Sequence, residues 1–191
     1  MSVLSDAHSR YSSSREKVLE HLFTGELLRT LWCMGVHDAE VLRSEVDGNG
    51  YDLAIECNSV LRHVQLKSSR RDGKASRQNI NAGIVKKPSG CVIWIMFDEP
   101  TLALGPFRWL SGIPGEPITA LGDIIARHTK GDSAGYKAER PNIRVVNKSR
   151  FREVGTMTEL ARELFGTALE PCGPAASTMT RVPHQIAGPS G

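Results

Sequence analysis

The stretch GYDLAIECNSVLRHVQLKSS, residues 50–69, holds two short runs in which apolar and polar residues alternate. Asn58-Ser59 lies between the runs, and this arrangement predicts a β-hairpin with a two-residue turn. In such a hairpin Asp52 lies directly opposite Gln65, so their side chains share one face of the sheet. Because side chains alternate along a strand, Lys67 lies on that face as well. The hairpin therefore predicts a group of three polar side chains.

The alternation of apolar and polar residues in this hairpin has two interpretations. A hairpin with one solvated face shows the same pattern as a hairpin that carries a functional site. A register shifted by one residue would set Asp52 opposite Val64 or Leu66, so the apolar pattern itself supports the polar grouping. Evidence from the rest of the sequence is needed to distinguish a solvated face from a functional site.

The first hundred residues predict an α/β domain. Their expected elements are an amphipathic helix over residues 12–34, a strand over 40–46, a DGNG turn over 47–50, the hairpin, a basic loop over 68–77, a helix over 80–87 and a strand over 91–97. The last of these, CVIWIMF, is a continuous apolar run, which is typical of a strand buried on both faces. The expected order is helix, three strands, helix, strand.

The remainder of the chain is less regular. Residues 117–128 predict a helix, and Thr156-Met157-Thr158-Glu159 has the pattern of a capping box that opens a helix through Phe165. The tail over 167–191 is rich in small residues and proline, a composition that predicts disorder. We therefore expect three parts: a core over residues 1–100, a basic helical or irregular extension over 101–166 that packs on the core, and the tail.

The length and composition of the chain limit the classes of function that it can have. The 191 residues suffice for one domain with a core, and no apolar run approaches the length of a membrane span. The N-terminus lacks the apolar region of a secretory signal, and three of the four cysteines lie in apolar stretches, so we expect a reducing, cytoplasmic location and no membrane partner. A net charge of +3 permits a polyanionic partner without requiring one.

One acidic residue of the first helix is anomalous. At 100° per residue, Glu26 falls in the middle of an apolar stripe, whereas Glu16 and Glu20 fall toward its edge. The stripe comprises Val18, Leu19, Leu22 and Phe23. An acid that interrupts an apolar stripe is a candidate functional residue, although a helix acid at a stripe edge more often reaches solvent.

These residues together resemble a known family. An acid on a first helix, an Asp at the start of a strand and Gln or Glu two residues before Lys on the next strand form the pattern of the PD-(D/E)xK nucleases, the restriction-endonuclease-like superfamily. Here the pattern is carried by Glu26, by Asp52 in GYDLAIE and by Gln65-Leu66-Lys67 in VQLKSS. The resemblance extends over about residues 12–97 and includes the order of elements. It implies a central mixed sheet flanked by helices.

The resemblance also implies a chemistry, the magnesium-dependent hydrolysis of phosphodiester bonds in DNA. Asp52 is the expected central ligand, with the Gln65 side chain, the Leu66 carbonyl and Glu26 as further ligands, and manganese is an expected substitute. Lys67 is expected beside the attacking water, where its charge favours hydroxide and stabilises the transition state. Gln65 stands where the family usually has Glu, which removes one negative charge and favours a single metal ion.

Basic side chains provide candidate contacts to phosphate. They form two groups, one in the loop after the hairpin and one in the basic extension. The residues are Arg70, Arg71, Lys74, Arg77, Lys137, Arg140, Arg144 and Arg150. Phosphate contact and plain solvation explain such residues equally well, and the scarcity of aromatic residues nearby argues against base stacking as the main mode of binding.

Two other functions are consistent with the same pattern. The first is a non-catalytic module that binds nucleic acid or protein and keeps a degraded nuclease fold. The second is a hydrolase of small phosphorylated metabolites, which needs an enclosed pocket. Convergence of Glu26 on Asp52, Gln65 and Lys67 would favour the nuclease. Cutting both strands of a duplex usually takes two sites, which is compatible with a homodimer.

Overall fold

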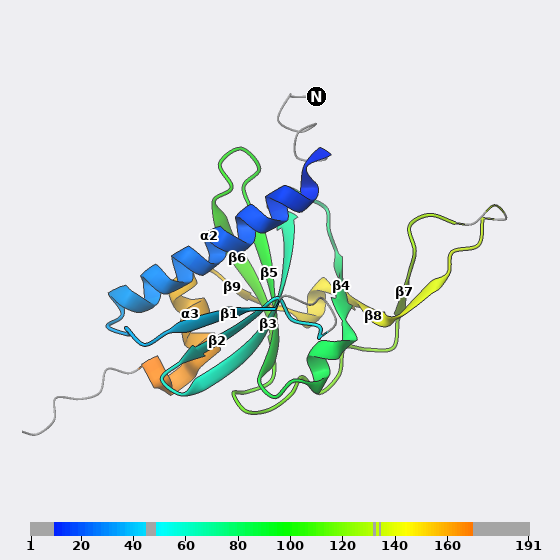
Figure 1. Cartoon of the computed structure of the whole chain (residues 1–191). Helices are drawn as coiled ribbons and strands as arrows, with labels where there is room; N and C mark the ends of the chain where they lie inside the picture. The colour runs from blue at the N-terminus through cyan, green and yellow to red at the C-terminus, as the bar shows by residue number, and fades with distance from the viewer. Residues whose placement is uncertain (1–9, 45–48, 132, 134, 170–191) are drawn as a thin grey trace, which may run out of the picture.

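The computed structural model describes residues 10–44, 49–131, 133 and 135–169. The protein has an α/β fold with a mixed central sheet, and two helices cover one face of that sheet (Figure 1). A second, three-stranded sheet packs against the other face through its own cluster of buried residues. The molecule thus has three layers: helices, central sheet and small sheet.

The central sheet has six strands. Its spatial order is β1 (Glu40–Arg43), β2 (Leu53–Cys57), β3 (Val60–Arg70), β5 (Gly90–Phe97), β6 (Leu104–Ser111) and β9 (Arg152–Val154). β3 and β5 are parallel, and every other neighbouring pair is antiparallel. Strands from residues 101–166 therefore complete the central sheet, and the expected division of the chain at residue 100 does not describe the layers.

The predicted hairpin and its register are confirmed. Leu53 pairs with Val64, and Asn58 and Ser59 have φ angles of 47° and 64°, which is the left-handed conformation that a tight two-residue turn requires. The regular ladder ends at this first pair, because the backbone N–H of Asp52 also donates to the Val64 carbonyl.

The helix expected over residues 80–87 is wrong. The chain forms β4 (Arg77–Asn81) followed by a 3-10 turn, η1 (Ala82–Lys86). The Asn81 side chain accepts a hydrogen bond from the Gly83 N–H, so it caps the turn in place of continuing a helix. Ile80 and Ile84 are both buried, and their spacing of four residues imitates the period of a helix.

The helix expected over residues 117–128 is also wrong. The segment is irregular and ends in the short strand β7 (Ile125–Arg127). Gly122 adopts a φ of +90°, which an α-helix does not allow, and only glycine adopts it without strain. Ile118 and Leu121 are buried under the small sheet, and they produced the helix-like spacing.

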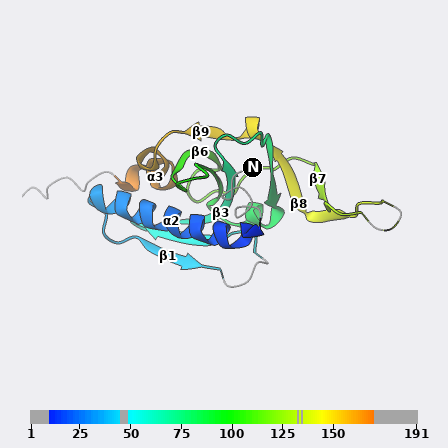
Figure 2. The same cartoon turned by 90° about the horizontal axis from the view of Figure 1, so that it is seen from above.

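The two helices lie on the same face of the central sheet. They are α2 (Ser12–Cys33) and α3 (Met157–Phe165), which close over the strands as Figure 2 shows from above. The predicted capping box is confirmed, since Thr156 accepts from the Glu159 N–H and Glu159 accepts from the Thr156 N–H. A 3-10 turn, η3 (Gly166–Leu169), follows α3.

β5 lies at the centre of these layers. All eight of its residues are buried, as the continuous apolar run predicted. Ile93 and Ile95 face the helices, whereas Val92 and Trp94 face the small sheet. The side chains of alternate residues therefore belong to two different cores.

The small sheet has the order β4, β8 (Glu139–Asn147), β7, and η2 (Lys148–Arg150) follows it. β7 and β8 extend away from the central sheet as an arm (Figure 1). None of the described helices is long and apolar enough to cross a membrane. The expected disordered tail lies outside the described residues from residue 170 onward, as do residues 47 and 48 of the expected DGNG turn.

Candidate active site at the edge of the central sheet

A hollow of about 550 Å³ opens at the point where β2 ends and β3 continues. It lies between the first half of α2, the second half of β3 and the strand β4. Its polar lining comprises Ser13, Glu16, Lys17, Glu20, Asp52, Lys67, Ser68, Gln78 and Asn79. Because β3 extends beyond its neighbour β2, one edge of β3 faces this hollow without a strand beside it.

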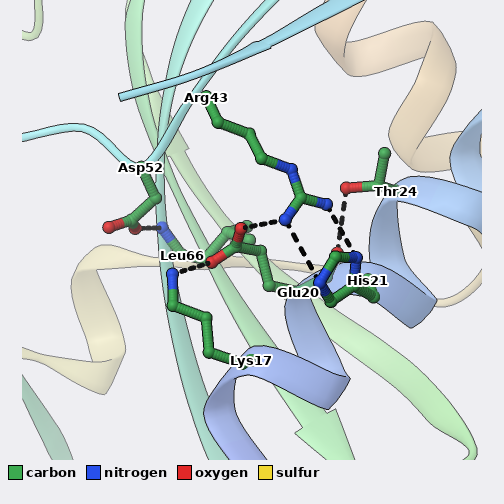
Figure 3. A network of polar contacts seen from close by, with 7 residues as sticks. All are labelled: Lys17, Glu20, His21, Thr24, Arg43, Asp52 and Leu66. Atoms are coloured by element: carbon green, nitrogen blue, oxygen red, sulfur yellow. Dashed lines mark hydrogen bonds and ion pairs between the residues drawn. The ribbon is translucent and has the colours of Figure 1, made fainter. Parts of the chain in front are cut away.

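Asp52 occupies the end of β2. Its carboxylate accepts a hydrogen bond of 2.6 Å from the backbone N–H of Leu66 (Figure 3). The ladder begins at Leu53 and Val64, so Asp52 is not paired with Gln65, and its carboxylate contacts the open edge of β3 at Leu66. The carbonyl of Leu66 points to the same side of β3 as its N–H. The Asp52 carboxylate and the Leu66 carbonyl oxygen therefore lie at the same open edge of β3.

Two acids of α2 share the hollow with Asp52, the exposed Glu16 and the more buried Glu20. The side chain of Glu20 is 11% exposed and lies between two cations, 3.1 Å from Lys17 Nζ and 3.2 Å from the guanidinium of Arg43 (Figure 3). Arg43 also lies 2.8 Å from Nδ1 of His21. The two ion pairs hold the Glu20 carboxylate toward β3.

The expectation that Glu26 converges on Asp52 is wrong. Glu26 lines a separate depression on the outer side of α2, together with His21 and Arg29. The apolar stripe that pointed to Glu26 combines residues of two different faces, because Leu19 and Phe23 are buried while Val18 and Leu22 are exposed. The true inner face is the row Leu19, Phe23, Leu27 and Leu31.

A signal that Glu16 and Glu20 face the same side as the buried row was present in the sequence. Glu16 and Glu20 precede Phe23 and Leu27 at helical spacing, so they continue the buried row toward the N-terminus of α2. Acids on a core-facing row are expected where the helix extends beyond the apolar part of the sheet. The missing information was which half of α2 lies beside Asp52.

Gln65 does not have the role that the sequence predicted. Its side chain is 4% exposed, its amide donates to the Gly50 carbonyl at 2.8 Å, and its carbonyl oxygen accepts from the Asn81 N–H at 3.0 Å. Both ends of the side chain are therefore bonded to backbone, and Gln65 is not among the residues that line the hollow. It connects β3 to the loop before Asp52 and to the end of β4.

Lys67 lies where the sequence predicted it, in the hollow that contains Asp52. The side chain is half-buried, and it leaves β3 between Leu66 and Ser68, which also line the hollow. The structure therefore brings Asp52, Leu66 and Lys67 together, adds Glu20, and leaves Glu26 and Gln65 outside.

The donor set of the hollow fits magnesium in type. Magnesium prefers oxygen, takes one or two carboxylates and keeps several waters. Glu20, Asp52 and the Leu66 carbonyl supply oxygen ligands of this kind. Within the part of the chain that the structure describes, no three His, Cys, Asp or Glu side chains are grouped to hold a metal.

The candidate phosphate-binding residues separate into two groups. Some already have protein partners: Arg70 pairs with Asp72 and Glu99, which raises the pKa of its guanidinium, and Arg71 donates to the Gly105 carbonyl. Arg144 and Arg150 likewise donate to backbone carbonyls, of Pro141 and Ala120. The remaining four, Lys74, Arg77, Lys137 and Arg140, are exposed and form no ion pair with any described residue.

Comparison with known proteins adds no family to this description. A scan of family models and a search of curated proteins found no match to the sequence. The geometry of the hollow therefore carries the functional argument.

Proposed function

We propose that the protein is a metal-dependent nuclease of the PD-(D/E)xK type that hydrolyses phosphodiester bonds of DNA. The observation that carries the proposal is the shared hollow of Glu20, Asp52 and Lys67 at the open edge of β3. A helix acid, an Asp at the start of a strand and a Lys on the adjoining strand are three of the four parts of the family pattern, and the fourth, Gln65, lies outside the hollow. The structure differs from the sequence-based assignment only in which acid and which oxygen ligands take part.

Each residue of the hollow has a distinct role in this proposal. Glu20, Asp52 and the Leu66 carbonyl would hold one magnesium ion, which supplies polarisation of the phosphoryl group and a lower pKa for bound water. Lys67 brings a positive charge beside the scissile phosphate, where it favours hydroxide and stabilises developing negative charge. Lys17 and Arg43 form ion pairs with the Glu20 carboxylate and orient it.

The surroundings of the hollow favour a polymer over a small metabolite. Residues on its rim, such as Ser13, Glu16, Lys17 and Asn79, are exposed, so the hollow is not an enclosed pocket. Lys74 and Arg77 lie on the loop and strand that border it, and Lys137 and Arg140 lie on the β7–β8 arm. A phosphate chain that enters the hollow would pass Lys74 and Arg77, and cations of this kind provide sequence-independent affinity.

The test is cleavage of supercoiled plasmid and branched DNA by the full chain with magnesium, manganese or EDTA. We expect cleavage with either metal and none with EDTA. Glu20→Gln, Asp52→Asn and Lys67→Ala should each lower the rate at least about 100-fold, as expected for loss of a ligand or of a charge that acts in the transition state. Glu26→Gln is the matched control and should keep wild-type activity.

Two outcomes would count against this assignment. Equal activity of wild type and Asp52→Asn would exclude the hollow, and loss of activity in Glu26→Gln but not in Glu20→Gln would restore the sequence-based choice of acid. Circular dichroism of each variant distinguishes loss of chemistry from loss of fold.

A binding module is the second candidate, and one observation favours it. Glu20 is already neutralised by Lys17 and Arg43, so a cation has to compete with two ion pairs for this carboxylate. A protein that binds DNA in a salt-dependent manner but cleaves none of the substrates in any metal would support the module over the nuclease.

A further inference from the structure

The outer part of the β7–β8 arm contributes little to the core of the protein. The arm comprises residues 125–144, from the start of β7 to Arg144, the residue of β8 that pairs with Ile125. Every described residue between 127 and 142 is exposed. Figure 1 shows that the arm extends away from the central sheet. A segment that buries so little is not explained by the stability of the fold, so its sequence needs another reason.

The arm carries the excess positive charge of the protein. Residues 125–144 contain five Lys or Arg and two Asp or Glu, so their net charge is +3. The whole chain also has a net charge of +3, which means that the rest of the chain is neutral on balance. Basic charge that is concentrated on an exposed projection produces a local positive field, and such a field attracts polyanions.

The composition of the arm favours a polyanion over a protein or a lipid bilayer. Residues 127–142 contain no Val, Leu, Ile, Met, Phe or Trp. The centre of a protein interface is poor in charged residues, and a segment that binds a membrane surface inserts apolar side chains. Lys130, Lys137 and Arg140 are exposed and form no ion pair with any described residue. Positive charge is therefore the property that the arm offers to a partner.

The outer part of the arm is a ribbon of two strands. β8 pairs with β4 only from Ile143 onward, so the ribbon lies beyond the edge of β4. Its two strands are held by the pair Ala126 and Arg140 and by a hydrogen bond from the His128 N–H to the Ala138 carbonyl. The backbone of the arm is therefore ordered by its own pairing and presents its basic side chains on a defined support.

A ribbon of this kind fits the major groove of duplex DNA. Two paired strands lie about 5 Å apart, and the major groove of B-form DNA, about 12 Å wide, admits such a ribbon with its side chains. The minor groove, at about 6 Å, is too narrow. The five residues from Ala126 to Gly131 reach at most about 17 Å, which exceeds the groove depth of about 8.5 Å.

The base of the arm lies close to the hollow that contains Asp52. Asn79 of β4 lines the hollow, and its neighbour Ile80 pairs with Arg144, where the arm begins. The base of the arm is therefore about one residue and one strand spacing of about 5 Å away from the wall of the hollow. Together with the reach of the arm, this distance is shorter than one helical turn of DNA, which is about 34 Å. One short duplex is therefore long enough to meet both the hollow and the arm.

We propose that the β7–β8 arm enters the major groove of duplex DNA, with Lys130, Lys137 and Arg140 in contact with phosphates of the groove walls. This inference rests on the proposed function, since it takes DNA as the polymer, and it names the B-form duplex as the substrate class. Duplex RNA does not fit, because the major groove of an A-form helix is deep and narrow. Binding through the arm needs neither a metal ion nor cleavage, so it can be tested without them.

The test is fluorescence anisotropy of a labelled DNA duplex of about two helical turns, or 21 base pairs, titrated with the full chain in EDTA. We expect wild type to bind this duplex more tightly than duplex RNA or single-stranded DNA of the same sequence. The triple variant Lys130→Gln, Lys137→Gln, Arg140→Gln should bind the DNA duplex at least about tenfold more weakly, and its slope of log affinity against log salt should fall by about 2–3.

A matched control separates the arm from the overall charge of the protein. It removes the same charge from exposed residues outside the arm, in the triple variant Arg29→Gln, Lys86→Gln, Arg162→Gln. At about 0.1 M salt, charges that do not contact the duplex are largely screened, so the control should bind DNA within about twofold of wild type. Equal affinity of the arm variant and wild type, or no binding of the duplex by wild type, would overturn the proposal.

Competition with groove-binding dyes identifies the groove. Methyl green, which occupies the major groove, should displace the wild-type protein from the DNA duplex, whereas netropsin, which occupies the minor groove, should not. Displacement by netropsin alone, or binding of duplex RNA as tight as that of duplex DNA, would overturn the assignment to the major groove. Arm-dependent binding to vesicles of anionic lipid without binding to DNA would overturn the proposal and assign the arm to a membrane surface.

Cleavage of the same duplex with magnesium distinguishes failure of this inference from failure of the nuclease assignment. Arm-dependent binding to DNA without cleavage in magnesium or manganese would support the arm and count against the nuclease. Cleavage with the same KM by wild type and the arm variant would support the nuclease and overturn the role of the arm.

Discussion

Changing Gln65 to Glu distinguishes a structural amide from a metal ligand. The family pattern usually has Glu here, so a ligand role predicts tighter magnesium binding in Gln65→Glu. The structure predicts a different result, because the amide donates to the Gly50 carbonyl and a carboxylate has no hydrogen to donate. The Glu variant would place two acceptors against each other in a site that is 4% exposed.

The loss of unfolding free energy in Gln65→Glu follows from this geometry. A buried carbonyl that loses its donor costs about 1–3 kcal/mol. An unpaired buried carboxylate adds to this cost, so we expect Gln65→Glu to lose about 3–5 kcal/mol of unfolding free energy at pH 8. Burial raises the pKa of the new carboxyl above its unfolded value of about 4.3. Stability is therefore retained at low pH, where the protonated acid donates to Gly50, and it is lost as the pH rises through the folded pKa.

The assay is urea denaturation of wild type and variant at pH 5 and pH 8 without metal, followed by calorimetric titration of magnesium. Gln78→Glu is the matched control for the denaturation alone, because Gln78 lines the hollow and its amide donates to the hydroxyl of Ser69, which can reverse its role and donate to a carboxylate. We expect the control to stay within about 1 kcal/mol of wild type. A Gln65→Glu protein of unchanged stability that binds magnesium more tightly would refute the structural role.

Three further predictions concern other parts of the molecule. Arg62 is buried, which lowers the pKa of its guanidinium, and it donates to the carbonyls of Glu163 and Leu164 at the end of α3, so Arg62→Met should cost about 3–5 kcal/mol in urea denaturation. Burial, followed by the nearby Asp38, raises the pKa of Cys57 from 9.0 to about 11. The protonated thiol therefore contributes stability that is fully present below pH 9 and is lost as the pH rises toward 11. Cys57→Ala lacks this thiol, so its urea midpoint should fall less steeply with alkaline pH than that of wild type. Changing Lys137 and Arg140 to Gln should reduce the slope of log affinity against log salt by nearly one per phosphate contact in a DNA-binding titration, and an unchanged slope would assign both residues to the solvated surface.

The elements with strong local signals could be predicted from the sequence alone. The hairpin followed from alternation around Asn58-Ser59, the start of α3 followed from its capping box, and β5 followed from a continuous apolar run. Each of these signals acts over a few neighbouring residues. Lys67 shared the hollow with Asp52 for the same reason, because the two strands of one hairpin set their relative positions.

The rest depended on contacts between residues far apart in the chain. Gln65 forms hydrogen bonds with Gly50 and with Asn81. The Asn81 contact exists only because residues 77–81 form the strand β4 of the second sheet and not the start of a helix. Nothing near Gln65 in the sequence distinguishes an amide that binds backbone from one that faces a metal. Only the packing of β4 beside β3 decides between them.

The choice between Glu20 and Glu26 had the same origin. The sequence determined that α2 carries acids at helical spacing beside apolar residues, and it placed Asp52 at the start of a strand, directly before β2. It did not determine which of the two apolar faces of α2 is buried, because both are equally hydrophobic by pattern. The tertiary structure decided this by docking Phe23 and Leu27 on the central sheet, which turned Glu20 toward Asp52 and Glu26 away. Helix periodicity is a local property, whereas the direction of a face depends on what the helix packs against.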